Sequence, residues 1–215
     1  MKKKKAVSKT TKQSSDITID DLNGLSRFTE IKYKTIWENT EYRAVSVGEK
    51  SVNQAFYCLN CSPGESLVDY GCGTGRAAKQ FALKGLKVIA LDIADNCLDP
   101  EFQDLRPFEF KVGNIWNFPE MYVGGEYAYM VNVLEHLPEE KIGSALANIE
   151  THTSKAIYFI ISTFPDFRYN QHLHLTVRPE YWWKQTLDVY FPSASYEVNA
   201  GQIHVYWRKC NAKGK

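Results

Sequence analysis

The sequence predicts an α/β protein with a doubly wound, mostly parallel seven-stranded sheet, helices on both faces and an antiparallel C-terminal hairpin. Three observations support this fold class. Short apolar runs alternate with helical segments between residues 66 and 190, which is typical of strand–helix units in a parallel sheet. The run KVIALD, residues 87–92, suits a strand covered on both faces. Two alternating runs near the C-terminus flank Asn199-Ala200-Gly201, which is a hairpin signal.

Three regions are expected along the chain: a disordered basic tail (1–20), an N-terminal helical lid (21–60) and the main domain (61–215). The first twelve residues hold six lysines and no acid, and too few apolar side chains to offset the entropy of ordering. Residues 24–60 have apolar and aromatic side chains at helical spacing with an interruption at 46–48, which predicts two helices.

In the main domain, the predicted elements follow from local signals. Pro63-Gly64 predicts a turn before the first strand, and Gly85 is a plausible C-cap of the first helix. Pro138 and the acidic residues after it favour a helix start. The predicted strands are 66–70, 87–92, 107–114, 126–133 and 155–164, and the predicted helices are 76–85, 138–150 and 179–190.

The composition limits the class of protein. The 26 Lys and Arg residues nearly balance the 25 Asp and Glu residues, so the net charge of +1 gives no global attraction to nucleic acid or anionic membranes. No membrane span is apparent, and five cysteines is an odd number, so we expect a soluble, cytoplasmic protein with free thiols. Cys58 and Cys61 form a single C-x-x-C without a second ligand pair, and no metal site is predicted.

The stretch LVDYGCGTGRAA, residues 67–78, indicates a nucleotide-type ligand. Its glycines follow a strand, where side chains would keep the backbone away from a ligand. A dinucleotide loop would read G-x-G-x-x-G, but Arg76 occupies its third glycine position, and Asp69 is a poor neighbour for a pyrophosphate. Asp69 suits an ammonium group instead. Asp92, which closes the second strand, is placed to accept hydrogen bonds from both hydroxyls of a ribose.

These motifs resemble the class I S-adenosylmethionine-dependent methyltransferases. The glycine loop matches their first motif, Asp92 in VIALDIA their second, VGNIWNF their third with Asn114 in place of the usual acid, and VNVLEHLPEE their fourth. The resemblance covers residues 66–162 and extends loosely to the hairpin. It implies S-adenosylmethionine as cofactor and S-adenosylhomocysteine as product. The cofactor-binding residues that it implies are Asp69, Gly71, Cys72, Gly73, Gly75, Asp92, Ile93, Asn114, Ile115, Asn132 and Val133.

Two histidines are the candidate catalytic residues. His136 follows the fourth strand at the mouth of the expected cleft, where it could act as a base, cap the next helix or line the cofactor site. The long connection after the fifth strand is a second candidate region, and His174 is slightly preferred over His172. The alternation in HLHLTV could instead form a short strand with both histidines facing solvent. Other residues considered there are Arg168, Tyr169 and Arg178.

Several aromatic residues and one arginine outside the motifs are also candidates for the site. One of Trp182 and Trp183 is expected in the core, and the other could face an acceptor. Trp37 and Tyr42 are expected in the lid. Arg43 either forms a surface salt bridge, the preferred interpretation, or pairs with the cofactor carboxylate.

Three functions remain open for a protein of this family. The favoured one is methyl transfer to an oxygen or nitrogen atom of a small molecule, as VLEHL suggests. Methylation of adenine or cytosine amines is disfavoured because Val133 and Leu134 follow Asn132 where Pro-Pro is expected, and no Pro-Cys dipeptide supports cytosine C5 chemistry. The alternatives are a methyltransferase for RNA or protein, with the lysine tail as an electrostatic arm, and a cofactor-binding regulatory protein without transferase activity.

Overall fold

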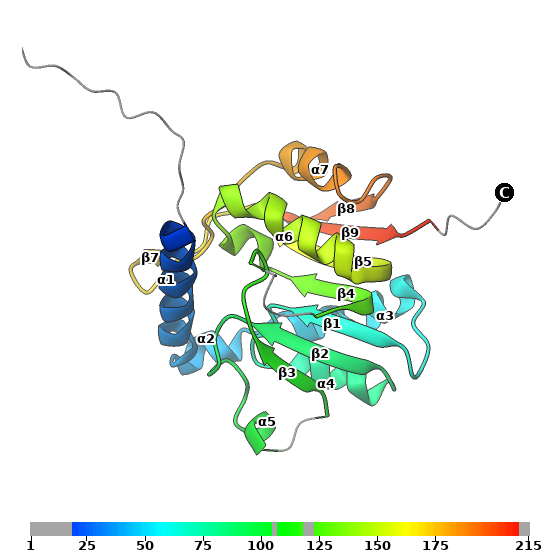
Figure 1. Cartoon of the computed structure of the whole chain (residues 1–215), viewed down its shortest axis with the longest axis horizontal. Coiled ribbons are helices and arrows are strands. Elements are labelled where there is room, and N and C mark those ends of the chain that lie inside the picture. Colours follow the sequence, from blue (N-terminus) through cyan, green and yellow to red (C-terminus); the bar gives the residue numbers. More distant parts are fainter. Residues whose placement is uncertain (1–18, 105–106, 118–122, 211–215) are drawn as a thin grey trace, which may run out of the picture.

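The computed structural model describes residues 19–104, 107–117 and 123–210. It contains a seven-stranded sheet in the order β3-β2-β1-β4-β5-β9-β8, with the last two strands antiparallel (Figure 1). The predicted fold class is therefore confirmed. The strands are β1 (Ser66–Tyr70), β2 (Lys87–Asp92), β3 (Glu109–Val112), β4 (Gly125–Val131), β5 (Thr153–Ser162), β8 (Ser195–Asn199) and β9 (Gln202–Arg208).

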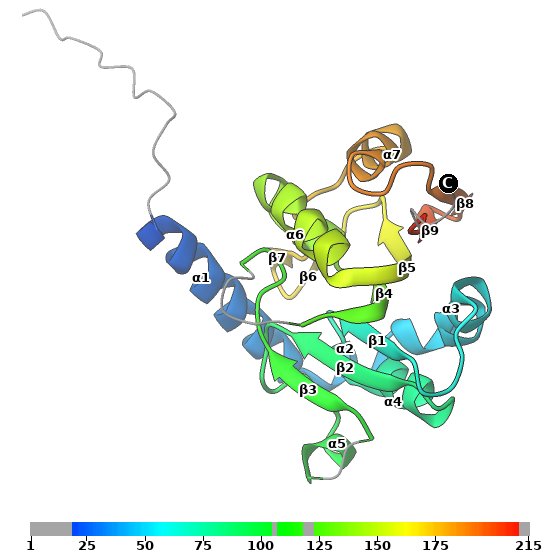
Figure 2. The same cartoon turned by 45° about the vertical axis from the view of Figure 1, so that its right-hand side comes forward.

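Helices cover both faces of this sheet (Figure 2), and successive side chains of β1, β2, β4 and β5 enter opposite cores. On β1, Leu67 packs in the core that includes α3 (Val52–Leu59) and α4 (Arg76–Leu83). The next residue, Val68, packs in the core that includes α6 (Glu139–His152) and α7 (Glu180–Asp188). Burial on both faces explains why the strands are apolar throughout.

The N-terminal segment forms more elements than expected. The structure has α1 (Ile19–Trp37), α2 (Thr40–Ala44), the 3-10 helix η1 (Gly48–Ser51) and α3. The prediction of two helices in residues 24–60 is therefore wrong. Asn39 separates α1 from α2, because its Oδ1 accepts the Glu41 and Tyr42 amides at 2.9 and 3.1 Å as an N-cap. The predicted disordered tail lies outside the described residues, apart from its last two positions, which belong to α1.

The C-terminal half of the chain contains two hairpins. The predicted hairpin turn is formed by Ala200 and Gly201, both with positive φ (48° and 76°), as a two-residue turn between twisted strands requires. The connection after β5 contains a two-residue hairpin, β6 (Phe167–Arg168) with β7 (Gln171–His172), and α5 (Glu101–Asp104) precedes β3. Trp183 is fully buried, whereas Trp182 packs against it and near Arg178.

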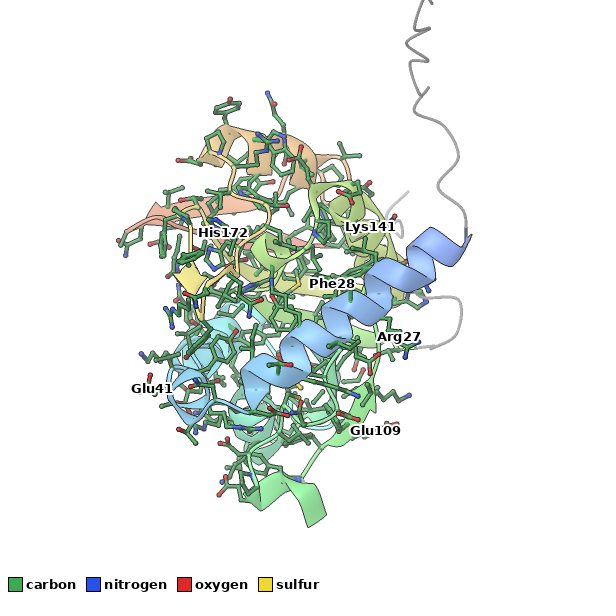
Figure 3. The ribbon with its side chains drawn as sticks, turned by 90° about the vertical axis from the view of Figure 1, so that its left-hand side faces the viewer. Arg27, Phe28, Glu41, Glu109, Lys141 and His172 are labelled. Atoms are coloured by element: carbon green, nitrogen blue, oxygen red, sulfur yellow. The ribbon has the colours of Figure 1, made fainter. Side chains whose placement is uncertain are left out.

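Helix α1 crosses the edge formed by the carboxyl ends of the parallel strands (Figures 1 and 3). Arg43 fixes it there. Its Nε donates to the Trp37 carbonyl at 2.7 Å, its Nη1 donates to the Cys97 and Leu98 carbonyls at 2.9 and 3.0 Å, and its Nη2 donates to the Asn96 carbonyl. The Nη1 of Arg43 also lies 3.8 Å from Asp99 Oδ1, so the expected salt bridge is present. The shorter contacts of the guanidinium are those with the backbone carbonyls.

We predict that Arg43→Met lowers the free energy of unfolding by about 2–3 kcal/mol, because charge-assisted hydrogen bonds to buried carbonyls are lost. Arg27→Met, on the exposed face of α1, is the matched control and should change the value by less than about 0.5 kcal/mol. Chemical denaturation at pH 7 measures both. Equal effects of the two substitutions would contradict the role of Arg43 as a clamp.

Candidate cofactor and acceptor site

Two adjoining cavities lie at the carboxyl ends of the parallel strands. The first is bounded by α1 and by the ends of β2, β3 and β4, and the second by the glycine loop, α2, η1 and the connection after β5. Both are lined by Trp37, Tyr42, Gly71, Asn132 and His136. The two cavities therefore form one continuous site, at the place where an open parallel sheet binds its ligands.

The glycine loop after β1 makes the site possible. Gly71 and Gly73 have φ of +71° and +50°, in the left-handed region that favours glycine. A Cβ at Gly71 would lie 2.4 Å from the side chain of Val133, and one at Gly73 would lie 2.8 Å from the Trp37 ring. These positions are therefore closed to larger residues.

Gly75 differs from the other two glycines of the motif. It begins α4 with φ of +81°, and a Cβ there would lie 2.9 Å from Leu98 and Phe108. It lines neither cavity among the described residues, so its role is to pack the start of α4. The next residue, Arg76, donates from Nε to Asp99 at 2.6 Å, which keeps its charge away from the loop.

Asp92 joins the end of β2 to the glycine loop. Its Oδ2 accepts the Gly73 amide and its Oδ1 accepts the Ala94 amide, both at 3.0 Å. Burial raises the pKa of Asp92 to about 6, and the amides of Ala94 and Gly73 act in the opposite direction. The carboxylate lines the first cavity beside Ile93.

Asp69, at the end of β1, is a buried acid without a cation. Its Oδ2 has no hydrogen-bond partner among the described residues, and the side chain lines the second cavity. Burial is the main cause that raises its pKa to about 8, and the nearby charge of Asp92 adds to the effect. A cationic ligand in the second cavity would offset the free energy that it costs to keep the buried Asp69 carboxylate ionised.

Asn114 lies in the first cavity, but its amide is already engaged. Its Nδ2 donates to Ser26 Oγ at 2.6 Å, and its Oδ1 accepts the Trp116 amide at 3.0 Å. The contact with Ser26 joins the end of β3 to α1. Asn114 therefore shapes the wall of the cavity beside Ile115, with one lone pair of its carbonyl oxygen left for a ligand.

His136 and His174 meet at the second cavity, with ring centroids 4.7 Å apart and perpendicular rings. The Nδ1 of His136 lies 3.0 Å from the Leu173 carbonyl oxygen, and the Nδ1 of His174 lies 2.6 Å from the Phe164 carbonyl oxygen. A carbonyl only accepts, so both Nδ1 atoms carry a proton, and in the neutral form of either ring the lone pair is on Nε2.

Burial determines the charge state of His136. It lowers the pKa of His136 to about 3, with a smaller effect from His174, so the imidazole is neutral at physiological pH. His172 is exposed in β7, whereas His174 is buried, so the interpretation of HLHLTV as a strand with two solvent-facing histidines is wrong. The fully buried Leu173 between them separates the two environments.

The structure gathers nearly all the residues that the sequence singled out. Every predicted cofactor-binding residue except Gly75 lines one or both cavities, as do His136 and His174. Sequence reasoning missed Tyr33, Tyr129 and Asp166, which reach the cavities from α1, β4 and the connection after β5, whereas Arg168, considered from the sequence, does line the second cavity. It also missed Glu135, a buried carboxylate whose signal was a charged residue inside an apolar run.

A family model described as a methyltransferase domain matches residues 37–209. The chain belongs to this methyltransferase family. The match includes the glycine loop, both strand-end acids and both histidines, and it starts at the last residue of α1.

Known relatives agree with this assignment. A probable cobalt-precorrin-6B C(15)-methyltransferase (decarboxylating) of Methanococcus maripaludis is 27% identical over 141 residues, covering 60% of this chain and 71% of the relative. A malonyl-[acyl-carrier protein] O-methyltransferase of Serratia marcescens is 33% identical over 79 residues, covering 36% of this chain and 31% of that protein.

Solved structures share the fold at low sequence identity. The DhpI–SAH complex has a TM-score of 0.67 at 14% identity, covering 89% of this methyltransferase and 99% of that chain. A Burkholderia thailandensis 1,6-didemethyltoxoflavin-N1-methyltransferase has a TM-score of 0.65 at 16% identity, with 93% of each chain covered. Identities this low show the fold.

The raised pKa of Asp69 predicts how stability depends on pH. An unfolded Asp titrates near pH 4, and Asp69 in the folded protein near pH 8, so the folded protein binds this proton more tightly. The stabilisation of the folded protein by this proton is complete below about pH 4 and is lost as the pH rises to about 8. Without ligand, Asp69→Asn should therefore lose less stability than wild type between pH 5 and pH 8.

Denaturant titrations at the two pH values measure this difference, with Asp95→Asn as the control at an exposed acid. Parallel pH profiles of wild type and Asp69→Asn would show that Asp69 is ionised in the folded protein, contrary to the prediction.

Proposed function

We propose that this protein transfers a methyl group from S-adenosylmethionine to an oxygen or nitrogen atom of a small-molecule acceptor. When bound, the cofactor supplies an electrophilic methyl group on a sulfonium. The observation that carries the proposal is the pair of buried, cation-free acids, Asp69 and Asp92, at adjacent strand ends beside a loop that excludes side chains.

The residues of the site fit this cofactor. The first cavity combines Asp92 with the apolar side chains of Ile93, Ile115 and Val133, which suits a ribose and an adenine ring. The second cavity presents the unpartnered Oδ2 of Asp69, which suits an ammonium group. We assign the adenosine to the first cavity and the amino-acid end to the second, so that the methyl group lies where the cavities meet.

The acceptor would enter the second cavity beside His136 and His174. Methyl transfer is an in-line displacement, so the walls must hold the acceptor atom close to the methyl carbon, which can contribute about 7–11 kcal/mol in favourable cases. A hydroxyl or ammonium acceptor must also lose a proton. We propose that the two histidines are catalytic and prepare the acceptor for attack through their free Nε2 atoms.

Helices α1 and α2 are proposed as the lid. Thr29, Tyr33 and Trp37 of α1 and Tyr42 of α2 line the first cavity, whereas α3 packs on a face of the sheet. The lid is therefore narrower than residues 21–60. It covers both cavities through Trp37 and Tyr42, so its position would control access for cofactor and acceptor alike.

Two of the named relatives support a small acceptor. The names give cobalt-precorrin-6B, malonyl-[acyl-carrier protein] and 1,6-didemethyltoxoflavin as acceptors, with methyl transfer to carbon, oxygen and nitrogen respectively. Two other functions, methylation of a macromolecule and a regulatory role, are also tested below. The lysine-rich residues 1–12 lie outside the described residues and could attract RNA, and Asn114 in place of an acid is compatible with a regulatory protein. No helix among the described residues is long and apolar enough for a membrane span.

We predict that Asp92→Ala weakens S-adenosylmethionine binding by at least 10-fold, because the ribose partner and the anchor of the Gly73 amide are both removed. Isothermal titration calorimetry gives the dissociation constant, and the unfolding temperature shows whether the variant is folded. Asp95→Ala, at an exposed acid three residues away, is the control and should bind like wild type. Normal affinity in folded Asp92→Ala would refute the placement of the ribose.

Deleting residues 1–16 should leave methylation of small acceptors unchanged, because in the described part of the chain the residues that line the two cavities all follow residue 28. A screen of hydroxyl and amine acceptors, with mass spectrometry of the products, measures this for both proteins. Salt-sensitive RNA binding and RNA methylation that disappear with the tail would favour the macromolecular function. Cofactor binding without turnover on any acceptor would favour the regulatory one.

A further inference from the structure

Glu135, His136 and His174 form a compact group of potential metal ligands beside the second cavity. Each offers one ligand atom, and these atoms lie within 4.8 Å of one another. Glu135 and His136 belong to η2 (Leu134–His136), directly after β4, and His174 comes from the connection after the β6–β7 hairpin. Segments far apart in sequence therefore bring two imidazoles and a carboxylate together.

The histidines are oriented as metal ligands usually are. In metal sites a histidine typically donates its second ring N–H to a carbonyl or carboxylate, which fixes the tautomer and points the other nitrogen at the ion. Both rings have this anchor, with Nδ1 at 3.0 Å from the Leu173 oxygen for His136 and at 2.6 Å from the Phe164 oxygen for His174. The two Nε2 atoms are left as donors for an ion.

Glu135 supplies an independent indication. Its side chain is 0% exposed, and its Oε1 accepts the Ser162 amide at 3.1 Å, but its Oε2 has no partner among the described residues. A buried carboxylate with an empty oxygen costs free energy unless a cation or a proton compensates it. The described chain places no Lys or Arg within ion-pair distance of it, which leaves room for a bound cation.

We propose that Glu135, His136 and His174 bind a divalent transition-metal ion at the acceptor end of the site. Two imidazoles and one carboxylate suit Zn²⁺ and Fe²⁺, and the carboxylate also suits Mn²⁺, whereas Mg²⁺ and Ca²⁺ prefer oxygen ligands throughout. Ligands on one ion stand about 2.0–2.2 Å from it. The three side chains therefore draw closer together on binding, and three protein ligands leave positions open toward the cavity.

The proposal rests on the proposed function and specifies how the histidines prepare the acceptor. An ion beside the cavity polarises an acceptor hydroxyl and lowers its pKa, so the proton leaves to solvent at neutral pH. A lone pair of the acceptor oxygen then forms the bond to the methyl carbon. The carbon–sulfur bond pair stays on sulfur, which yields the methyl ether and S-adenosylhomocysteine. The favoured acceptors are therefore molecules with an ionisable hydroxyl.

The test titrates metal-free full-length protein with Mn²⁺ and follows the free ion by electron paramagnetic resonance, with Zn²⁺ as competitor. Wild type should bind one Mn²⁺ per chain. Glu135→Gln and His174→Asn should each weaken binding by at least 10-fold. The matched controls are Glu140→Gln and His172→Asn, at exposed residues outside the group, which should bind like wild type.

Pulsed resonance spectra of the wild-type complex give a readout that needs no variant, because two directly bound imidazoles produce characteristic nitrogen couplings. Absence of these couplings, or equal Mn²⁺ affinity in wild type, Glu135→Gln and His174→Asn, would overturn the metal site. If the wild-type protein binds S-adenosylmethionine but no metal, only the metal site is overturned. If the wild-type protein does not bind S-adenosylmethionine, the proposed function is overturned.

Discussion

The bond between the Asp92 carboxylate and the Gly73 amide is the interaction on which the rest of the site depends. It joins the end of β2 to the loop that follows β1, while the second carboxylate oxygen holds the Ala94 amide. The loop can reach Asp92 because Gly71 and Gly73 adopt positive φ without a Cβ that would strike Val133 or Trp37. The ends of β1 and β2 are thus joined into one wall that both cavities share.

The same close approach determines where the N-terminal helix lies. The Trp37 ring packs over Gly73, so the last turn of α1 is positioned by the absence of a side chain in the loop. Arg43 then joins this turn to the loop after β2. It donates to one carbonyl of the turn, that of Trp37, and to three carbonyls of the loop. Gly73, which is proposed to contact the cofactor, therefore also positions the proposed lid, so the glycine loop and α1 are coupled.

The sequence predicted the strands and the glycine loop well because these features depend on local patterns. Strands buried on both faces are apolar throughout, and a carboxylate at a strand end is visible as a break in that pattern. The break at Asn39 was missed because it depends on one capping side chain. Gly75 was assigned to the cofactor because spacing alone does not distinguish a glycine that faces a ligand from one that packs a helix start.

The contacts that complete the site depend on tertiary structure, which a single sequence does not specify. His174 lies 38 positions after His136, and only the folding of the β6–β7 region places the rings 4.7 Å apart. No metal site is expected from the sequence, because Cys58 and Cys61 have no second ligand pair at suitable spacing. Glu135 was passed over for a related reason: its burial results from its position after β4, beneath the connection that carries His174.

Asp69, Asp92 and Glu135 share an electrostatic property that links folding to ligand binding. All three are buried carboxylates, burial raises the pKa of each, and no Lys or Arg in the described parts of the chain neutralises any of them. The ligand-free protein therefore carries a cost that a cation would remove. An ammonium near Asp69 and a divalent ion at Glu135 would each lower it, and a ligand that binds only the folded state stabilises that state. The site thus favours cationic ligands because the described chain supplies no Lys or Arg to these acids, so that protons or a bound cation must neutralise them.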